Sequence, residues 1–292
     1  MTATELNNLL LRVEVLARKN WIHAMHLLSE AEELYPRDPR IPATRGLIYF
    51  ETHNYKEASK SYQKAYELGA RDIQVLYMLG NSYFVQGEFR LALVYYNQIT
   101  SKSVELCYNK ALALTNLGRT GESIKILQEA IQSFPPQIYV YILLTDQFIR
   151  LNELDQALST MLEAEKRLGP SPGLHALKGS IYGKQKNWLL SYASFKKADN
   201  GKMAIYPEHY GLYANAAALS GFVTESLALF ENAIVFMPYT ESVYEDYCRA
   251  ALEAGRLDLA KKIISKARKN LLRLSPALRL MQQRLNPPKP EP

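Results

Sequence analysis

The 292-residue sequence lacks the motifs by which most enzymes are recognised. It contains no GxxxxGK[ST], GxGxxG, GxSxG or HExxH pattern, so a phosphate-binding loop, a dinucleotide-binding turn, a hydrolase nucleophile and a zinc-protease helix have no support. His23 and His26 lie three residues apart on one predicted helix, but no third metal ligand accompanies them. We therefore expect neither enzymatic activity nor a bound metal or cofactor.

Cysteines and long apolar runs are also rare. Cys107 and Cys248 are the only cysteines, and they lie far apart without CxxC spacing, so neither a disulfide framework nor a zinc site is indicated. No apolar run reaches the roughly 18 residues that suggest a membrane span. The first residues lack a basic segment ahead of an apolar one, so no signal peptide is expected. These absences favour a cytoplasmic protein.

The net charge of +6 is concentrated at one end of the chain. Between Arg256 and Lys289 there are ten lysines and arginines and a single acid, Asp258. This segment could face an acidic protein, nucleic acid or an anionic membrane, but apolar residues at core spacing lie between the charges, so a solvated helix face also explains it. The segment has no aromatic side chain for base stacking, which argues against nucleic acid. The basic patch consists of Lys261, Lys262, Lys266, Arg268, Lys269 and Arg273.

The strongest positive signal is a period of about 34 residues, which is typical of helical-repeat proteins. Small residues recur at this spacing, with one bulky exception at Ile99, where the repeat is short. The series is Ala31, Ala65, Ile99, Ala130, Ala164, Ala198, Ala233 and Ala267.

Each period contains two apolar stripes of helical spacing. In the third period, Leu76 and Leu79 lie on one predicted helix, and Ala92 and Tyr96 lie on the next. Gly87 lies between them, where glycine permits the left-handed backbone of a tight turn. The pattern predicts a helical hairpin in every period.

The pattern resembles the tetratricopeptide repeat, a 34-residue unit with preferred residues at fixed positions. Position 8 prefers a small residue, position 11 an aromatic one, position 20 alanine, position 24 an aromatic one, and position 32 proline. The matches include Gly46, Gly80 and Gly179 at position 8; Tyr49, Tyr83, Phe148 and Tyr182 at position 11; Ala24, Ala58, Ala92, Ala157 and Ala260 at position 20; Tyr62, Tyr96, Phe195 and Phe230 at position 24; and Pro36, Pro135 and Pro238 at position 32.

The resemblance implies an all-α, right-handed α-solenoid of about eight helix-turn-helix repeats. A capping helix is expected at 275–285, because Ser275 and Pro276 resemble a helix start, and a Pro-rich tail at 286–292. The predicted repeats are 5–38, 39–72, 73–103 (short), 104–137, 138–171, 172–206, 207–240 and 241–274.

The resemblance also implies that the first helix of each repeat lines a concave groove through positions 2, 5, 9 and 12. In repeats two to five these positions are rich in aromatic and aliphatic residues, which indicates a binding surface for a peptide or protein. The alternative is that they pack inside a tightly wound superhelix or against another copy. The expected groove residues are Leu47, Phe50, Tyr77, Asn81, Phe84, Tyr108, Asn109, Leu112, Tyr139, Ile142, Asp146 and Ile149.

Some members of this family hold a partner's C-terminal carboxylate with two asparagines and three cations. The matching positions here keep the asparagines as Asn81 and Asn109 but carry Tyr77, Tyr139 and Leu143 in place of the cations. We therefore expect an extended apolar or aromatic segment rather than a carboxylate tail.

The first predicted helix is apolar on nearly every side, and a helix of this kind is normally buried. It could contact a second copy, accept a partner helix, or be capped by its own neighbour. The possible assembly contact comprises Leu6, Leu9, Leu10, Val13 and Leu16.

The sequence therefore predicts a non-enzymatic scaffold or adaptor that binds a partner segment in its groove. A structural subunit of a larger assembly is the alternative, with the apolar first helix and the basic last repeat as contacts. Homo-oligomerisation is a further possibility, and nucleic-acid binding through 256–289 has less support.

Overall fold

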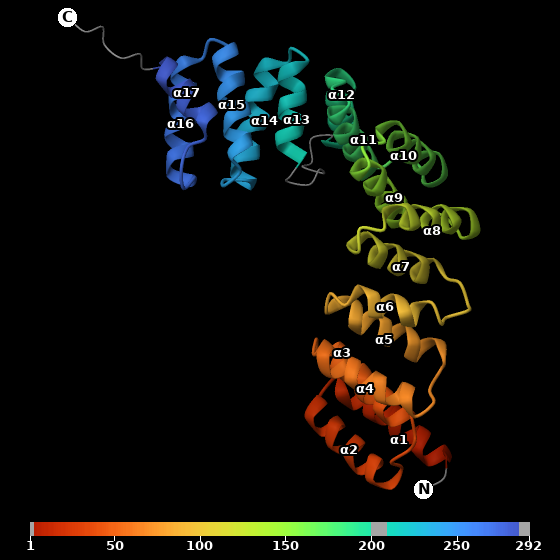
Figure 1. Cartoon of the computed structure of the whole chain (residues 1–292). Coiled ribbons are helices and arrows are strands. Elements are labelled where there is room, and N and C mark those ends of the chain that lie inside the picture. The colour runs from red at the N-terminus through yellow and green to blue at the C-terminus, as the bar shows by residue number, and fades with distance from the viewer. Residues whose placement is uncertain (1–2, 200–208, 286–292) are drawn as a thin grey trace, which may run out of the picture. The chain divides into compact units, whose positions relative to one another are not determined.

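The computed structural model describes residues 3–199 and 209–285, and within them the chain is entirely helical (Figure 1). The all-α solenoid class predicted from the sequence is confirmed. The helices are α1 Ala3–Ala17, α2 Trp21–Leu34, α3 Arg40–Glu51, α4 Tyr55–Glu67, α5 Ile73–Val85, α6 Phe89–Tyr96, α7 Val104–Asn116, α8 Thr120–Ser133, α9 Ile138–Arg150, α10 Leu154–Leu168, α11 Pro172–Lys184, α12 Trp188–Asp199, α13 His209–Leu219, α14 Val223–Phe236, α15 Glu241–Glu253, α16 Leu257–Asn270 and α17 Pro276–Leu285.

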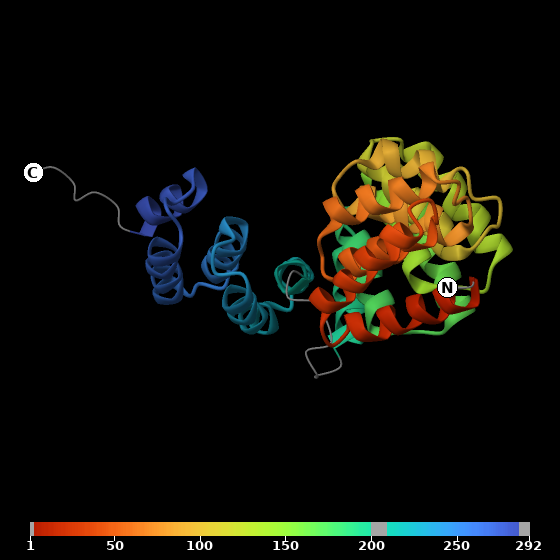
Figure 2. The same cartoon turned by 90° about the horizontal axis from the view of Figure 1, so that it is seen from below.

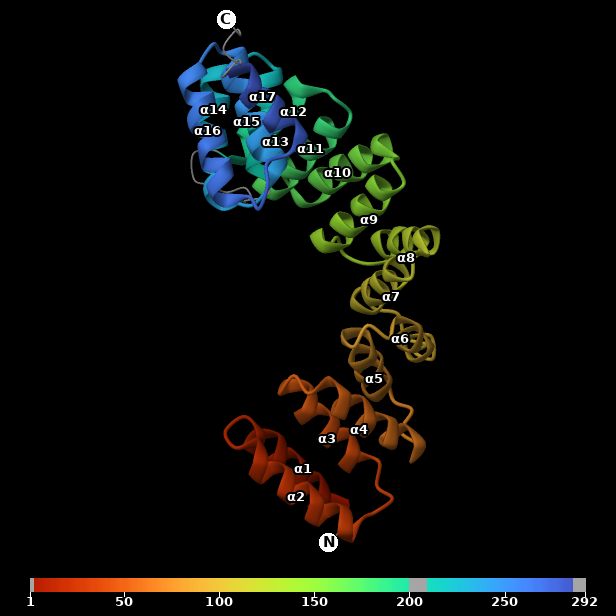
Figure 3. The same ribbon diagram turned by 60° about the vertical axis from the view of Figure 1, so that its left-hand side comes forward.

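The chain divides into two compact units, Met1–Pro135 and Pro136–Pro292, which we describe separately. In the first unit, α1 to α8 follow one another in chain order, and α3 contacts both α1 and α5 (Figure 3). In the second unit, each of the helices α13 to α17 (blue in Figure 2) contacts the next. First helices of successive repeats also contact each other within a unit, as α1 does with α3 and α13 does with α15.

Small residues at position 8 let the two helices of a repeat approach closely. A Cβ added to Gly46 would lie 2.8 Å from the ring of Tyr62, and one added to Gly179 would lie 2.9 Å from the ring of Phe195. Both aromatic side chains are buried. The facing aromatic ring thus fills the space that the missing side chain leaves.

The turns within the hairpins use the left-handed backbone region even where glycine is absent. Gly87 has φ 81°, and Asn152 has φ 59° in the same place in its repeat. His53 and Lys186 also have φ of 60° there, and the sequence pattern did not single them out. The hairpin geometry therefore overrides residue preference at these two positions.

The structure describes the short third repeat and the capping helix, but not the other regions that were expected to be irregular. The second helix of the third predicted repeat, α6, has only eight residues. Helix α17 begins where Ser275 Oγ accepts a hydrogen bond from the backbone N–H of Leu278 (3.1 Å), and it packs on α15 and α16. The predicted tail at 286–292 lies outside the described residues, as does the junction of the sixth and seventh repeats at 200–208. The repeat boundaries stay predictions.

Candidate functional site

We call the surface of α1, α3, α5 and α7 in the first unit the inner face. Most of the predicted groove residues lie on the last three of these helices. Asp72 begins α5 by accepting a hydrogen bond from the backbone N–H of Val75 (3.0 Å), and Ser103 begins α7 in the same way with Leu106 (3.1 Å). These caps satisfy backbone groups at the helix starts and set where each helix begins. The side chains that follow are thereby held at fixed positions along the face.

The two predicted asparagines are joined in one hydrogen-bond network. Asn109 Nδ2 donates to Tyr77 Oη (2.8 Å) and to Asn81 Oδ1 (3.2 Å), and the hydroxyl of Tyr96 also donates to Asn81 Oδ1 (2.6 Å). Tyr96 is fully buried, and the other three side chains are half-buried. Burial raises the pKa of Tyr77, so its hydroxyl stays protonated over the physiological range. The network ties α5, α6 and α7 together and fixes the asparagine side chains.

Other predicted groove aromatics pack partly against the second helices. The ring of Phe50 meets that of Tyr55 edge to face at 5.2 Å, and Phe84 meets Phe89 at 5.3 Å. Both are half-buried. Alanine substitutions at Phe50 or Phe84 would therefore disturb packing as well as any groove contact.

The remaining predicted groove residues belong to the second unit, on α9. Ile142 is exposed, Tyr139 and Ile149 are half-buried, and Asp146 Oδ2 accepts a hydrogen bond from Arg150 Nε (2.6 Å). These four residues therefore lie in a different unit from the other predicted groove residues.

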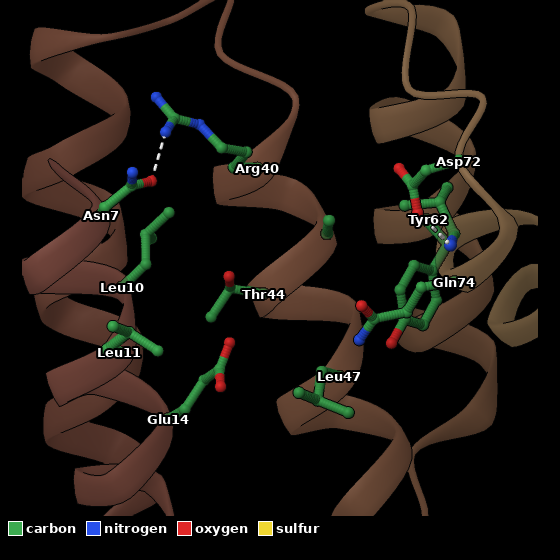
Figure 4. Close-up of a pocket in the computed structure, with 12 residues that line it drawn as sticks. Asn7, Leu10, Leu11, Glu14, Arg40, Thr44, Leu47, Tyr62, Asp72 and Gln74 are labelled. Atoms are coloured by element: carbon green, nitrogen blue, oxygen red, sulfur yellow. Dashed lines mark hydrogen bonds between the residues drawn. The ribbon is translucent and has the colours of Figure 1, made fainter. Parts of the chain in front are cut away.

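A pocket of about 440 Å³ opens on the inner face between α1, α3 and α5 (Figure 4). Apolar and polar side chains alternate around it, with Glu14 extending from α1 toward α3, and Gln74 and the ring of Tyr62 reaching the hollow from the other side. The lining comprises Asn7, Leu10, Leu11, Glu14, Arg40, Ala43, Thr44, Leu47, Tyr62, Asp72, Gln74 and Val75.

A second pocket of about 420 Å³ adjoins the first, because Gln74 lines both. It is bounded by α5, by the chain between α6 and α7, and by the start of α7. Its lining is mainly apolar, with Tyr77 at one side and Leu106 at another. Two neighbouring pockets along α5 suit an extended chain better than a compact ligand.

Only Leu47 of the first pocket's lining was among the predicted groove residues. The signal for three others was present, because Arg40 and Ala43 occupy positions 2 and 5 of the second predicted repeat and Gln74 occupies position 2 of the third. Asn7 and Glu14 belong to the first helix, whose orientation the repeat pattern did not give.

The charged side chains that line the pocket differ in whether they have an ion-pair or hydrogen-bond partner. Arg40 donates to both carboxylate oxygens of Asp38 (2.8 and 2.5 Å) and to Asn7 Oδ1 (2.5 Å). The carboxylate of Asp72 is engaged as the helix cap. Glu14 makes no ion pair in the part of the chain that the structure describes. The pocket lining therefore carries the negative charges of Glu14 and Asp72 beside an arginine that Asp38 already neutralises.

The predicted assembly contact on α1 is largely occupied by the chain's own core. Leu6, Leu10 and Val13 are buried against α2 and α3, while Leu9 and Leu16 are partly buried. The apolar side chains that α1 leaves exposed are different ones, Leu11 (61% exposed) and Val15 (64% exposed). Capping by the neighbouring helices explains the buried set, since residues spaced three and four apart share one helix face.

The predicted basic patch lies on the solvent face of α16 and just beyond it. All six of its residues are exposed, whereas Ile263, Ile264 and Ala267 between them are buried. Arg268 donates a hydrogen bond from Nη2 to Gln282 Oε1 on α17 (2.8 Å). This arrangement is the one expected of an amphipathic helix.

The described residues were predicted to hold neither a metal site nor a membrane-spanning helix. Within 3–199 and 209–285, no three side chains of His, Cys, Asp or Glu are grouped so that they could hold a metal ion. None of the helices in these ranges is long and apolar enough to cross a membrane. His26 lies 3.3 Å from the carboxylate of Glu30 on the same helix.

Comparison with known proteins places this architecture in a recognised class. Residues 51–130 match the model of the family described as anaphase-promoting complex, cyclosome, subunit 3. A comparison with curated proteins gives no match.

Solved structures resemble the chain over most of its length. A tetratricopeptide repeat protein from Parabacteroides merdae is 15% identical with a TM-score of 0.61, covering 85% of this chain and 98% of the other. The C-terminal part of a repeat protein from Cytophaga hutchinsonii is 17% identical with a TM-score of 0.62, covering 77% and 94%. In the Cut9–Hcn1 hetero-tetramer of APC/C, the matching chain is 12% identical with a TM-score of 0.54, covering 82% of this chain and 48% of the other.

Identities this low establish the fold and nothing finer. Together with the repeat pattern they show that the chain is a helical-repeat protein of the tetratricopeptide type. Folds of this type are typical of protein-interaction scaffolds.

Proposed function

We propose that this protein is a non-enzymatic adaptor that binds an extended segment of a partner protein along the inner face of its first unit. The observation that carries the proposal is the pair of neighbouring pockets that share Gln74 as a lining residue. They follow α5 from its contact with α3 toward the start of α7. A segment lying there would pass the Tyr77–Asn109 network and reach Tyr108.

The chemistry of the face suits peptide backbone as well as side chains. Asn81 and Asn109 each carry an amide donor and an amide acceptor, and both side chains are half-buried on this face. A peptide backbone offers groups of both kinds. The pockets and the network together provide apolar contacts and directional hydrogen bonds.

The test is affinity capture of partners with the wild-type protein and two arginine variants. Gln74→Arg places a long charged side chain at the residue that lines both pockets. Val94→Arg is the matched control, because Val94 is exposed on the second helix of the same predicted repeat and lines neither pocket. Partners lost with Gln74→Arg and kept with Val94→Arg support the proposal, and equal capture by all three proteins contradicts it.

A second candidate is a structural role in a larger assembly. The name of the matching family and the Cut9–Hcn1 structure refer to subunits of such an assembly. In this chain, the exposed Val15 and Ile22 near the N-terminus are the apolar side chains that favour it. Light scattering tests the homo-oligomeric form, since Val15→Asp should dissociate an assembly built on this surface and leave a monomer unchanged.

A further inference from the structure

The first pocket has the chemistry to select one kind of side chain within the bound segment. Leu10, Leu11, Leu47 and Val75 give it apolar walls, and the carboxylate of Glu14 gives it a negative charge. A cavity of about 440 Å³ is large enough for a single long side chain with part of its backbone.

Arg40 does not cancel the charge of Glu14. Its Nε and Nη2 donate to Asp38, and its Nη1 donates to Asn7, so most of the donors of the guanidinium are already used. Because Arg40 and Asp38 neutralise each other, an entering carboxylate would meet few free donors and the negative field of Glu14. The charge balance therefore favours a cation.

The hydroxyl of Tyr62 gives independent evidence that the pocket takes a polar group. The side chain is only 2% exposed, it lines the pocket, and its hydroxyl has no hydrogen-bond partner among the described residues. An enclosed hydroxyl without a partner is destabilising, so a ligand group that can hydrogen-bond to it is favoured. Burial raises the pKa of Tyr62, and the nearby negative charges of Glu51 and Glu14 raise it further.

We propose that this pocket receives a lysine or arginine side chain of the partner segment, with its head beside Glu14 and Tyr62 and its stem on Leu11 and Leu47. Long basic side chains combine an apolar stem with a charged head, which matches the two kinds of wall. The inference rests on the proposed function, because it assigns a specificity to the segment bound along the inner face.

The test begins with selection of N-terminally acetylated random dodecapeptides on the full-length protein. Acetylation removes the terminal amine, so a cation can enter only as a side chain. An enriched peptide is then synthesised with its shared basic residue and with norleucine in its place, and both are titrated by calorimetry. The proteins are wild type, Glu14→Gln, Tyr62→Phe and the control Glu33→Gln, which removes an exposed acid of α2 that does not line the pocket.

We expect the basic peptide to lose roughly fivefold or more in affinity on Glu14→Gln, and the norleucine peptide to bind the two proteins equally. Tyr62→Phe should weaken the basic peptide by a smaller factor, and Glu33→Gln should change neither peptide. Melting curves identify any variant that is unfolded, and Glu14→Gln is not expected to unfold because Glu14 is not in the core.

The outcomes separate this inference from the proposed function. Peptides without a common basic residue that bind wild type and Glu14→Gln equally, but fail on Gln74→Arg, overturn the inference and leave the proposed function intact. Equal losses on Glu14→Gln and Glu33→Gln also overturn it, because the pairing would then be a general charge effect. If no peptide is enriched and Gln74→Arg keeps every captured partner, both proposals fail.

Discussion

Gly80 and Tyr96 are packed so closely that a Cβ on the glycine would lie 2.4 Å from Cε1 of the tyrosine ring. The ring is fully buried between the two helices of the third predicted repeat. Its hydroxyl continues into the hydrogen bond with Asn81 on the inner face. One close contact therefore sets both the spacing of α5 and α6 and the position of a groove side chain.

This contact predicts that Gly80→Ala destabilises the protein. The ring is fixed by packing and by its hydrogen bond, so α5 and α6 must separate to admit a methyl group, at a cost of about 1–3 kcal/mol. Gly121→Ala is the control, because nothing lies within 4 Å of a Cβ at that helical glycine. Urea unfolding should show a lower midpoint for Gly80→Ala alone, and equal midpoints for both variants would contradict the packing argument.

The asparagine network predicts a coupling between Asn81 and Tyr96. Asn81→Ala leaves the buried tyrosine hydroxyl without its acceptor, which should lower the free energy of unfolding by about 1–3 kcal/mol. Adding Tyr96→Phe removes the unpaired hydroxyl, so the double variant should be more stable than the sum of the single effects implies. Strictly additive unfolding energies would show that the hydrogen bond contributes nothing to stability.

Asp38 predicts an acid-dependent part of the stability. Hydrogen bonds from Arg40 hold the pKa of Asp38 below its usual range, against the opposing effect of burial. A carboxyl whose pKa is depressed by folding stabilises the protein above its unfolded-state pKa, about 3.9, and this stability is lost as the pH falls through the folded-state pKa. Asp38→Asn should thus lower the unfolding free energy at neutral pH by about 1 kcal/mol and have a smaller effect near pH 3.

Glu122→Gln provides the comparison for Asp38. Glu122 accepts two hydrogen bonds from Arg119, but both side chains are half-exposed, so solvent screens the pair. Thermal melts at neutral pH and near pH 3 should reveal a pH-dependent difference for Asp38→Asn and none for Glu122→Gln. If both variants show the same pH-dependent change in melting temperature, the partly buried Asp38 pair is no stronger than the exposed Glu122 pair, and the prediction is wrong.

The turn at Lys186 predicts a stabilising substitution. Its φ of 60° is unfavourable for a residue with a Cβ, and glycine occupies the corresponding turn position at Gly87 and Gly221. Lys186→Gly should raise the free energy of unfolding by about 0.5–1 kcal/mol, because relief of the left-handed strain outweighs the entropy of glycine. Lys184→Gly, at the last residue of α11 and without a positive φ to relieve, should not raise it. A decrease in stability for Lys186→Gly, measured by chemical denaturation, would refute this reasoning.

Local spacing made much of the fold predictable. The small residues at position 20, such as Ala58 and Ala92, are fully buried as the period requires. Ser275 begins α17 as its position before proline indicated. These features depend on contacts within one hairpin or on backbone geometry at one turn, which a short stretch of sequence specifies.

The candidate site was less predictable because it depends on contacts between repeats. The orientation of helix α1 follows from its packing on α2 and α3, and this packing buries Val13 while leaving Leu11 in the pocket. Arg40, at position 2 of the second predicted repeat, would by itself suggest a site for an anion. Its ion pair with Asp38 neutralises that charge, which the repeat pattern does not reveal.

The sequence by itself determined the helical hairpins, their period and the small-to-aromatic contacts within them, because these follow from spacing along the chain. Only the tertiary structure decided that Glu14, Tyr62 and Gln74 meet at one pocket and that the two asparagines share hydrogen bonds with Tyr77 and Tyr96. Glu14, Tyr62 and Gln74 come from three repeats, and Asn109 comes from the repeat after that of Asn81, so their meeting depends on how successive hairpins stack. The stacking is set by side-chain volume and burial across the whole layer, which no single repeat encodes.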